Sequence, residues 1–281
     1  MGEDRRAAPE RLGAYGLRIA GLEGASRWLV PQAADAARLE VETAIVPLDE
    51  SPHELDEHSA NLRLLGGGRL RMRREERVAR YSLPAEVSDA ELLHPYLTAA
   101  CALVWQWSGR EALHAGAFTL GGGAVLLLGG KGLGKSSTLA WLAGERGAAV
   151  LSDDLAIIEN GRVLVGPRCI DTRPSGGAAP DAPGSEVVRG RERLRVALPE
   201  AAGPIPVRAS VVLRWGDALS IASVPAGERL ALIAPQRMFP PLAGDPETLL
   251  ELVALPTVAL TRPRNVEQLP AGVEALLGYL A

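Results

Sequence analysis

Lysine is nearly absent from this 281-residue chain, and that scarcity makes the two lysines it has informative. Lysine and arginine together number 30, yet Lys131 and Lys135 are the two lysines, and both lie within residues 129–136. An ammonium group is a compact point charge that fits between phosphate oxygens, whereas a guanidinium is a broad planar fork. Lys135 therefore marks a place where arginine would not serve.

Cysteine is also scarce. Cys101 and Cys169 are the two cysteines, which excludes a disulfide framework, and neither has a second cysteine or a nearby histidine at metal-ligand spacing. We expect both to be small buried apolar residues.

Long hydrophobic runs and a strong excess of one charge are absent as well. The first six residues are polar and lead into no apolar stretch of signal length, and the longest apolar runs are too short for a bilayer. The net charge of −4 argues against a dedicated nucleic-acid binder. A cytoplasmic protein without a membrane or nucleic-acid partner is predicted, with one large or two modest domains.

The segment that holds both lysines fits the phosphate-loop pattern G-x-x-x-x-G-K-[ST]. Residues 124–128 before it read as a buried strand, and residues 136–146 after it as a helix that stops at Gly147. A glycine-rich turn alone would not explain a lysine followed by a hydroxyl. The sequence therefore predicts a nucleotide site with Ser136 on Mg²⁺, formed by Gly129, Gly130, Lys131, Gly132, Leu133, Gly134, Lys135, Ser136 and Ser137.

Two adjacent carboxylates, Asp153 and Asp154, end the next strand-like run. Beside a phosphate loop, one carboxylate can hold Mg²⁺ and the other can accept a proton from an incoming hydroxyl. Successive side chains of an extended strand point to opposite faces, so both roles need a turn at the strand end. The alternative is an ordinary turn or helix cap.

His114 with Gly116, the phosphate loop and the Asp pair follow one another in an order that resembles the HPr serine kinase family, which shares its fold with phosphoenolpyruvate carboxykinase. The resemblance covers residues 110–175 well. It implies an α/β P-loop kinase domain in which His114, Lys135, Asp153 and Asp154 are active-site residues; for His114, an ordinary core or surface imidazole is the alternative. We take Asp153 as the base and Asp154 as a metal ligand. The chain departs from the family at Lys131, where serine is usual, and at Ala115, which separates His114 from glycine.

A second edge of the site is expected at residues 166–174. By loose resemblance, Asp171 is a candidate metal ligand and Arg173 a candidate phosphate contact, with Arg168 behind them; ordinary surface polarity is the alternative. Residues 174–185 have the composition of a mobile loop that closes over substrate. The alternate arginines that follow are candidates to engage an acidic peptide: Arg189, Arg191, Arg193 and Arg195.

The pattern of predicted strands and helices divides the chain into a smaller β-rich N-terminal module (1–87), a connecting helix (88–110) and the kinase domain (111–281). Strands are predicted over 16–20, 28–30, 44–46, 69–73 and 78–83, and Ser88 with Glu91 forms a capping-box pattern. The arginines of 69–80 present either a basic sheet face or, as we prefer, a solvated face offset by Glu75 and Glu76. The C-terminal third is expected to be structural, with strands over 207–215, 219–223 and 257–260 and helices over 246–255 and 266–280.

The predicted reaction is transfer of the ATP γ-phosphoryl group, with Mg²⁺, to a serine of a peptide or small protein. HPr itself is not the expected acceptor, because the N-terminal part and the segment after the Asp pair depart from the family. Divergent relatives occur beside lasso-peptide genes, so the resemblance suggests a precursor peptide held by the N-terminal module. A small-molecule kinase and a nucleotide-gated binding module stay open, and resemblance also leaves a homo-oligomer open.

Overall fold

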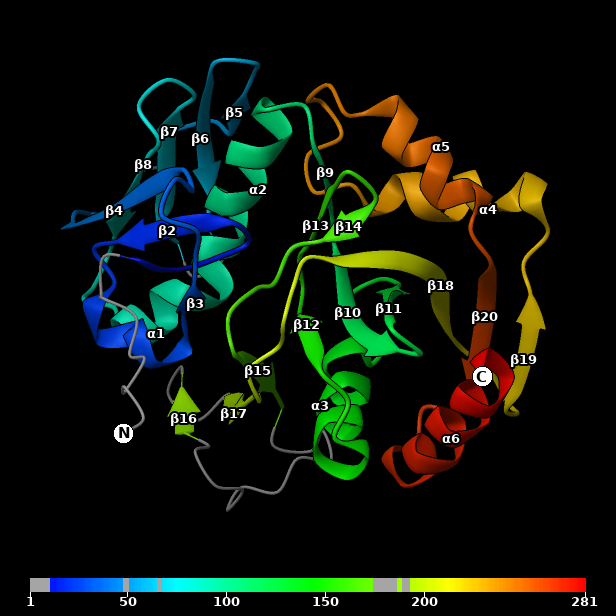
Figure 1. Ribbon diagram of the computed structural model, residues 1–281. Coiled ribbons are helices and arrows are strands. Elements are labelled where there is room, and N and C mark those ends of the chain that lie inside the picture. The colour runs from blue at the N-terminus through cyan, green and yellow to red at the C-terminus, as the bar shows by residue number, and fades with distance from the viewer. Residues whose placement is uncertain (1–10, 48–50, 65–66, 174–185, 189–192) are drawn as a thin grey trace, which may run out of the picture.

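The protein is a mixed α/β structure with several sheets and few helices, seen here in a computed structural model (Figure 1). The structure describes residues 11–47, 51–64, 67–173, 186–188 and 193–281. Residues 174–185 and Arg189 and Arg191, for which a substrate-closing loop and a peptide contact were predicted, lie outside the described residues. Among the described residues, no helix is both long and apolar enough to cross a membrane.

An eight-stranded sheet is formed entirely by residues 12–83, in the order β3-β1-β2-β4-β8-β7-β6-β5. The strands predicted over 69–73 and 78–83 are confirmed, and in both of them buried apolar residues alternate with polar ones. The long strand β4 was predicted over its last two residues only. The strands of this sheet are β1 (Leu12–Ala14), β2 (Leu17–Ala20), β3 (Val30–Pro31), β4 (Arg38–Ile45), β5 (Glu54–Leu55), β6 (Ser59–Arg63), β7 (Arg69–Arg73) and β8 (Val78–Leu83).

A helical segment joins this sheet to the rest of the chain. It begins at α1 (Asp89–Glu91), where the predicted capping box is present: the Ser88 side chain accepts from the Glu91 N–H, and the Glu91 side chain accepts from the Ser88 N–H. It continues through η3 (Leu92–Tyr96) into α2 (Leu97–Trp107). His94 is extended inside η3 (φ −147°, ψ 121°) because it precedes Pro95, whose ring disfavours a helical conformation in the residue before it.

A nine-stranded sheet forms the second layer, with the main strand order β12-β10-β11-β18-β14-β13-β9 and β20 and β19 continuing from β18. Strands β11, β18 and β20 are parallel neighbours. The strand predicted over 124–128 is confirmed and is buried on both faces. The strands are β9 (Glu111–Leu113), β10 (Ala115–Leu120), β11 (Gly123–Leu128), β12 (Val150–Ser152), β13 (Ala156–Glu159), β14 (Arg162–Val163), β18 (Ile205–Trp215), β19 (Ser220–Ser223) and β20 (Thr257–Arg262).

Helices cover both faces of the nine-stranded sheet (Figure 1). Val125 and Leu127 of β11 pack toward α3 and α6, whereas Leu126 and Leu128 pack toward α4 and α5, as the two-residue period of a strand requires. The helix predicted after the glycine loop is confirmed and ends at Gly147; α4 was not predicted. These helices are α3 (Lys135–Arg146), α4 (Ala226–Ile233), α5 (Pro246–Ala254) and α6 (Leu269–Leu280), with the short turns η2 (Glu23–Trp28), η4 (Ala234–Gln236) and η5 (Val266–Gln268).

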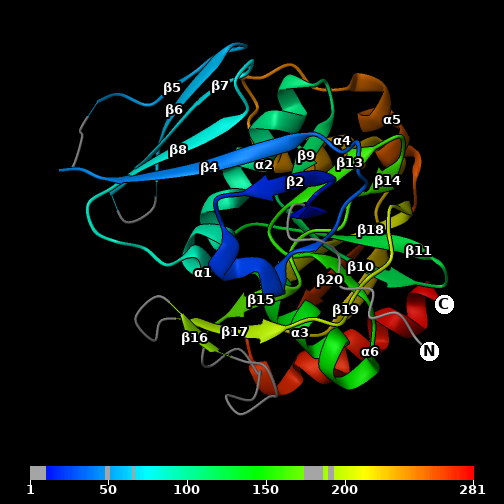
Figure 2. The same ribbon diagram turned by 60° about the vertical axis from the view of Figure 1, so that its left-hand side comes forward.

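A small sheet lies beside α3, in the order β15-β17-β16 (Figure 2). Its strands are β15 (Cys169–Thr172), β16 (Glu186–Val188) and β17 (Arg193–Ala197). Both cysteines are buried and free, as predicted, one on α2 and one on β15.

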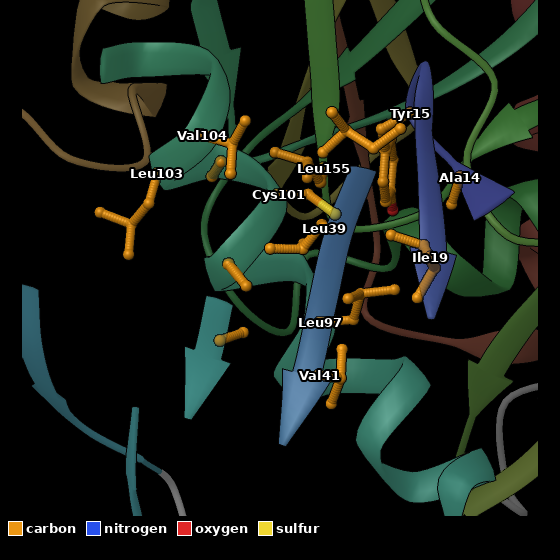
Figure 3. Close-up of a cluster of buried hydrophobic side chains, with 14 of the residues drawn as sticks. Ala14, Tyr15, Ile19, Leu39, Val41, Leu97, Cys101, Leu103, Val104 and Leu155 are labelled. Carbon is orange, nitrogen blue, oxygen red and sulfur yellow. The ribbon is translucent and has the colours of Figure 1, made fainter. Parts of the chain in front are cut away.

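One hydrophobic core joins the N-terminal sheet to the nine-stranded sheet. Leu97 and Cys101 of α2 pack with Leu39 of β4 and Tyr15 on one side and with Leu155, directly after the Asp pair, on the other (Figure 3). The Trp105 Nε1–H donates to the Tyr15 carbonyl at 2.7 Å. The residues that follow the Asp pair thus rest on packing from the N-terminal sheet.

Candidate active site

The loop between β11 and α3 has the backbone of an anion cradle. Gly129, Gly132 and Gly134 have φ values of 143°, 86° and 88°, which glycine adopts without strain. A Cβ at Gly134 would come within 2.5 Å of Arg262 Nη2. Lys135 is buried, its Nζ donates to the Gly129 carbonyl at 2.7 Å, and burial lowers its pKa. The loop therefore curls around the start of α3, where backbone N–H groups converge.

Three parallel strands end at the same edge of the nine-stranded sheet. The carboxyl end of β11 leads into the glycine loop, β18 ends at Trp215, and β20 ends at Arg262. In open α/β sheets, ligands bind in the crevice outside the carboxyl ends of such strands. On the other side of β11, past β10, β12 ends just before Asp153.

The backbone turns at Asp154, as the prediction of two different roles for Asp153 and Asp154 requires. Asp154 has φ 62°, a left-handed conformation that is uncommon outside glycine and that concentrates at functional sites. Ser136 Oγ donates to Asp153 Oδ1 at 3.1 Å. The second Asp153 oxygen, Oδ2, is buried without a hydrogen-bond partner among the described residues. Burial, reinforced by the neighbouring Asp154 carboxylate, raises the pKa of Asp153 to about 7.

Two histidines contact Asp154 from different parts of the chain. His94 Nε2 lies 3.5 Å from Asp154 Oδ2, and His114 Nε2 lies 3.6 Å from Asp154 Oδ1. Burial alone would raise the pKa of Asp154, but the two imidazoles outweigh it and hold that pKa well below its usual value. Burial disfavours a charged His94, yet the Asp154 and Asp171 carboxylates outweigh this effect and raise its pKa. Asp154 is therefore an ionised carboxylate with both oxygens in contact with imidazoles.

A divalent cation fits this group of side chains. Potential ligand atoms of His94, Asp153 and Asp154 all lie within 4.8 Å of one another. The buried, unpartnered Asp153 Oδ2 is the independent sign, because a buried carboxylate oxygen without a partner is costly. Carboxylate and hydroxyl oxygens suit Mg²⁺, and a bound cation would favour the ionised form of Asp153. Ser136 and Asp153 supply a hydroxyl and a carboxylate beside the glycine loop, and these two groups would hold Mg²⁺.

Asp171, predicted as a metal ligand, is engaged elsewhere. Arg195 Nε donates to Asp171 Oδ1 at 2.7 Å and Arg195 Nη2 to Asp171 Oδ2 at 2.9 Å, with both side chains buried. The same guanidinium donates to the carbonyls of Ala90 and, at 3.2 Å, His94. The expectation that Arg195 contacts a peptide was wrong, because this residue is fully buried. The pair therefore connects the small sheet to the backbone of the helical segment at Ala90 and His94.

A cavity of about 720 Å³ is lined by residues of the glycine loop together with Asp154, His94 and His114. Asp153, Gly129, Gly130 and Leu133 lie outside its lining, and Arg173 is an exposed part of it. The residues predicted for the site that line the cavity are His114, Lys131, Gly132, Gly134, Lys135, Ser136, Ser137, Asp154, Asp171 and Arg173.

Several lining residues were not predicted, and some of them come from the C-terminal third, which was expected to be structural. Trp215, Arg237 and Arg262 come from that third, and His94 comes from the connecting helix. Arg262 Nη2 donates to Thr138 Oγ1 at 3.0 Å, and burial lowers the pKa of Arg262 to about 10. A sequence signal existed for His94, since a His-Pro pair interrupts an otherwise apolar helix. Arg262 had a weaker signal, an arginine at the end of an apolar strand.

Comparisons with known proteins give little for this chain. No family model matches it, and no curated protein matches it. Among solved structures, a match is the HPr(Ser) kinase/phosphatase from Coxiella burnetii, with 13% sequence identity and a TM-score of 0.31, covering 60% of this chain and 97% of that chain. Both the identity and the TM-score are low, so this likeness indicates no function for the chain.

Proposed function

We propose that this protein is an ATP- and Mg²⁺-dependent kinase that transfers the γ-phosphoryl group to a hydroxyl. The observation that carries the proposal is the Ser136–Asp153 hydrogen bond of 3.1 Å. In this bond, the Asp153 carboxylate at the end of a strand contacts the Ser136 hydroxyl, directly after the loop lysine. A hydroxyl and a carboxylate in these positions hold Mg²⁺ in P-loop nucleotide enzymes.

The glycine loop and Lys135 are suited to bind the polyphosphate. The loop N–H groups and the start of α3 supply positive partial charge without a desolvation cost at the moment of reaction. Lys135 Nζ, now on the Gly129 carbonyl, is placed to move onto a phosphate oxygen. In the proposal, Ser136 and Asp153 hold Mg²⁺, which supplies charge neutralisation for the phosphate oxygens.

Asp154 is the base in this proposal, which reverses the roles expected from the sequence. Asp153 is tied to the P-loop hydroxyl and is buried, whereas Asp154 lines the cavity where an acceptor can enter. His94 and His114 hold the Asp154 carboxylate ionised and oriented. The acceptor oxygen attacks the γ-phosphorus, the bond to the bridging oxygen breaks, ADP leaves, and the hydroxyl proton passes to Asp154.

The acceptor in the proposal is a serine of a peptide or small protein, and this part rests on the sequence resemblance. Thr98 of α2 and Met238 after η4 line the same cavity as Asp154, so an acceptor bound in this cavity can reach Asp154.

The test is incubation of the purified protein with Mg²⁺ and γ-labelled ATP, with the peptides and small proteins encoded beside its gene offered in turn. Label should appear on a serine. Lys135→Ala and Asp154→Asn should each lower the transfer rate by roughly 10²- to 10³-fold, because each removes a group that acts in the transition state. Arg73→Ala on the outer face of β7 is the control and should leave the rate unchanged. Transfer that survives both active-site changes would refute the proposal.

A further inference from the structure

One end of the cavity has a different chemical character from the end that holds the Asp pair. It is formed by residues at and after the ends of β18 and β20, and it includes an indole, two aliphatic side chains and an amide. The uncharged residues are Trp215, Asn265, Val266 and Leu269, and Arg262 and Arg264 line the same end. No group in this end takes part in the proposed phosphoryl transfer.

The strand order places this end opposite the acceptor. From the glycine loop after β11, the Asp pair lies toward β12, and Trp215 and Arg262 lie toward β18 and β20. In phosphoryl transfer, the attacking and leaving oxygens are roughly in line on opposite sides of the phosphorus. If the acceptor stands at Asp154, the leaving ADP must extend toward Trp215.

The indole is held directly against the phosphate loop. The Arg262 guanidinium lies over the Trp215 ring, 5.3 Å from its centroid. Arg262 is itself fixed by Thr138 Oγ1 at 3.0 Å and by the Leu133 and Gly134 carbonyls at 3.4 Å. A Cβ at Gly134 would lie 3.5 Å from Trp215 Cη2. The half-buried indole is thus oriented beside the loop before any ligand arrives.

The neighbouring side chains add an apolar rim and a donor. Val266 is 49% exposed, and Leu269 is buried beneath it. Asn265 Oδ1 accepts from the Glu267 N–H at 2.9 Å, which leaves its NH₂ group to donate to a ring nitrogen. A flat, largely apolar ring with nitrogen acceptors on its edge matches this combination.

We propose that Trp215, Asn265 and Val266 form the nucleobase subsite, which takes the adenine of the nucleotide. The inference rests on the proposed function, because the base reaches this end only when its phosphates occupy the glycine loop. Trp215 is the main contact in this subsite, since stacking of a base on an aromatic side chain contributes about 1–3 kcal/mol.

The test compares two ligands that share phosphates but differ in the base. Dissociation constants for Mg²⁺-ATP and Mg²⁺-tripolyphosphate are measured by calorimetry on the wild type, Trp215→Ala, Trp215→Phe and Val266→Ser. Trp141→Ala is the matched control, because Trp141 lies on α3 outside the cavity lining. Val266→Ser changes an exposed residue and therefore keeps the test usable if Trp215→Ala does not fold.

Trp215→Ala should weaken ATP binding roughly 10-fold and leave tripolyphosphate binding unchanged. Trp215→Phe should keep most of the ATP affinity, Val266→Ser should lose a few-fold for ATP alone, and Trp141→Ala should change neither ligand. Unchanged ATP affinity in Trp215→Ala, or an equal loss for both ligands, would overturn the subsite and leave the kinase proposal standing. If the wild type binds neither ligand, the phosphate site and the subsite both fail.

Discussion

The N-terminal sheet and the nine-stranded sheet share a core but carry their polar residues in different ways. In the N-terminal sheet, charged side chains lie along the strands, as with Arg80 of β8 between Glu42 and Glu76. In the nine-stranded sheet, the inner strand β11 is buried throughout, and the polar cavity residues that this sheet contributes lie at or after the ends of its strands. The cavity residues of the described chain start at His94, after the last strand of the N-terminal sheet.

This difference indicates that the nine-stranded sheet supplies the candidate site and that the N-terminal sheet supports it. A strand that is buried on both faces can present chemistry only at its ends, so the parallel strands collect the candidate site at one edge. The N-terminal sheet contributes indirectly, through α2 and the shared core. Tyr81 of β8 donates to the Tyr96 carbonyl at 3.0 Å, two residues from His94. Five single substitutions would break or sharpen this comparison.

The largest effect is expected at the Asp171–Arg195 pair, which joins the small sheet to the helical segment. Arg195→Ala should lower the free energy of unfolding by about 3–5 kcal/mol, because it removes the guanidinium that neutralises the buried Asp171 carboxylate. Urea denaturation measures the change. The double substitution Asp171→Leu with Arg195→Met should recover most of the loss. A single substitution that costs less than about 1 kcal/mol would contradict the role of the pair.

A cavity created in the core beside the N-terminal sheet should lower the stability of the whole protein. Leu39 is fully buried in the core that also contains Leu155, so Leu39→Ala should cost about 2–5 kcal/mol. Because the core is shared, calorimetry should show one transition that moves to a lower temperature as a unit. Two separate transitions, with only one of them moved, would show that the sheets unfold independently.

The two carboxylates of the candidate site should affect stability with opposite signs. The folded-state pKa of Asp153 is raised to about 7 by burial, so the stability this residue contributes is present below its unfolded pKa and is lost as pH rises through 7. Asp153→Asn should therefore stabilise the metal-free protein by about 2 kcal/mol at pH 8, with no gain at pH 4.

Asp154→Asn is the matched control for that prediction. The pKa of Asp154 is held low by its two histidines, so its contribution is present above its unfolded pKa and is lost as pH falls. This substitution should destabilise the protein at pH 8. Thermal unfolding of both variants in EDTA at pH 4 and pH 8 measures the difference, and equal signs at pH 8 would refute the electrostatic account of the pair.

The smallest effect is expected on the outer face of the N-terminal sheet. Arg80→Ala removes an exposed cation from two surface ion pairs, and such pairs contribute little in water. Neither the melting temperature nor the affinity for nucleotide should change measurably. A clear loss of peptide binding in this variant would instead give the N-terminal sheet a direct part in substrate recognition.

Local patterns in the sequence were enough for several elements of the fold. The capping box at Ser88, the alternating strands β7 and β8 and the buried strand before α3 were all predicted, because each depends on neighbours in the sequence. The helix over α5 and the strand over β20 were also predicted within two residues of their ends. The solvated face expected over 69–80 has one exception: Arg69 is buried and donates to Asn61 Oδ1 at 2.8 Å.

The rest of the candidate site depends on contacts between distant parts of the chain. Trp215 and Arg262 reach the glycine loop because β18 lies next to β11 and β20 lies next to β18 in the sheet, and no local pattern gives that order. His94 reaches Asp154 through a sequence separation of 60 residues, across the shared core. The burial of Arg195 could not be read from its neighbours, which alternate charged and apolar residues as a surface strand does.

A crystal structure with Mg²⁺ and a non-hydrolysable ATP analogue tests the central claim most directly. The account predicts phosphates within the loop of residues 129–136, Mg²⁺ on Ser136 Oγ and Asp153, Asp154 facing the γ-phosphate, and the base beside Trp215. Phosphates bound away from Lys135, or a metal held without Ser136 and Asp153, would contradict it.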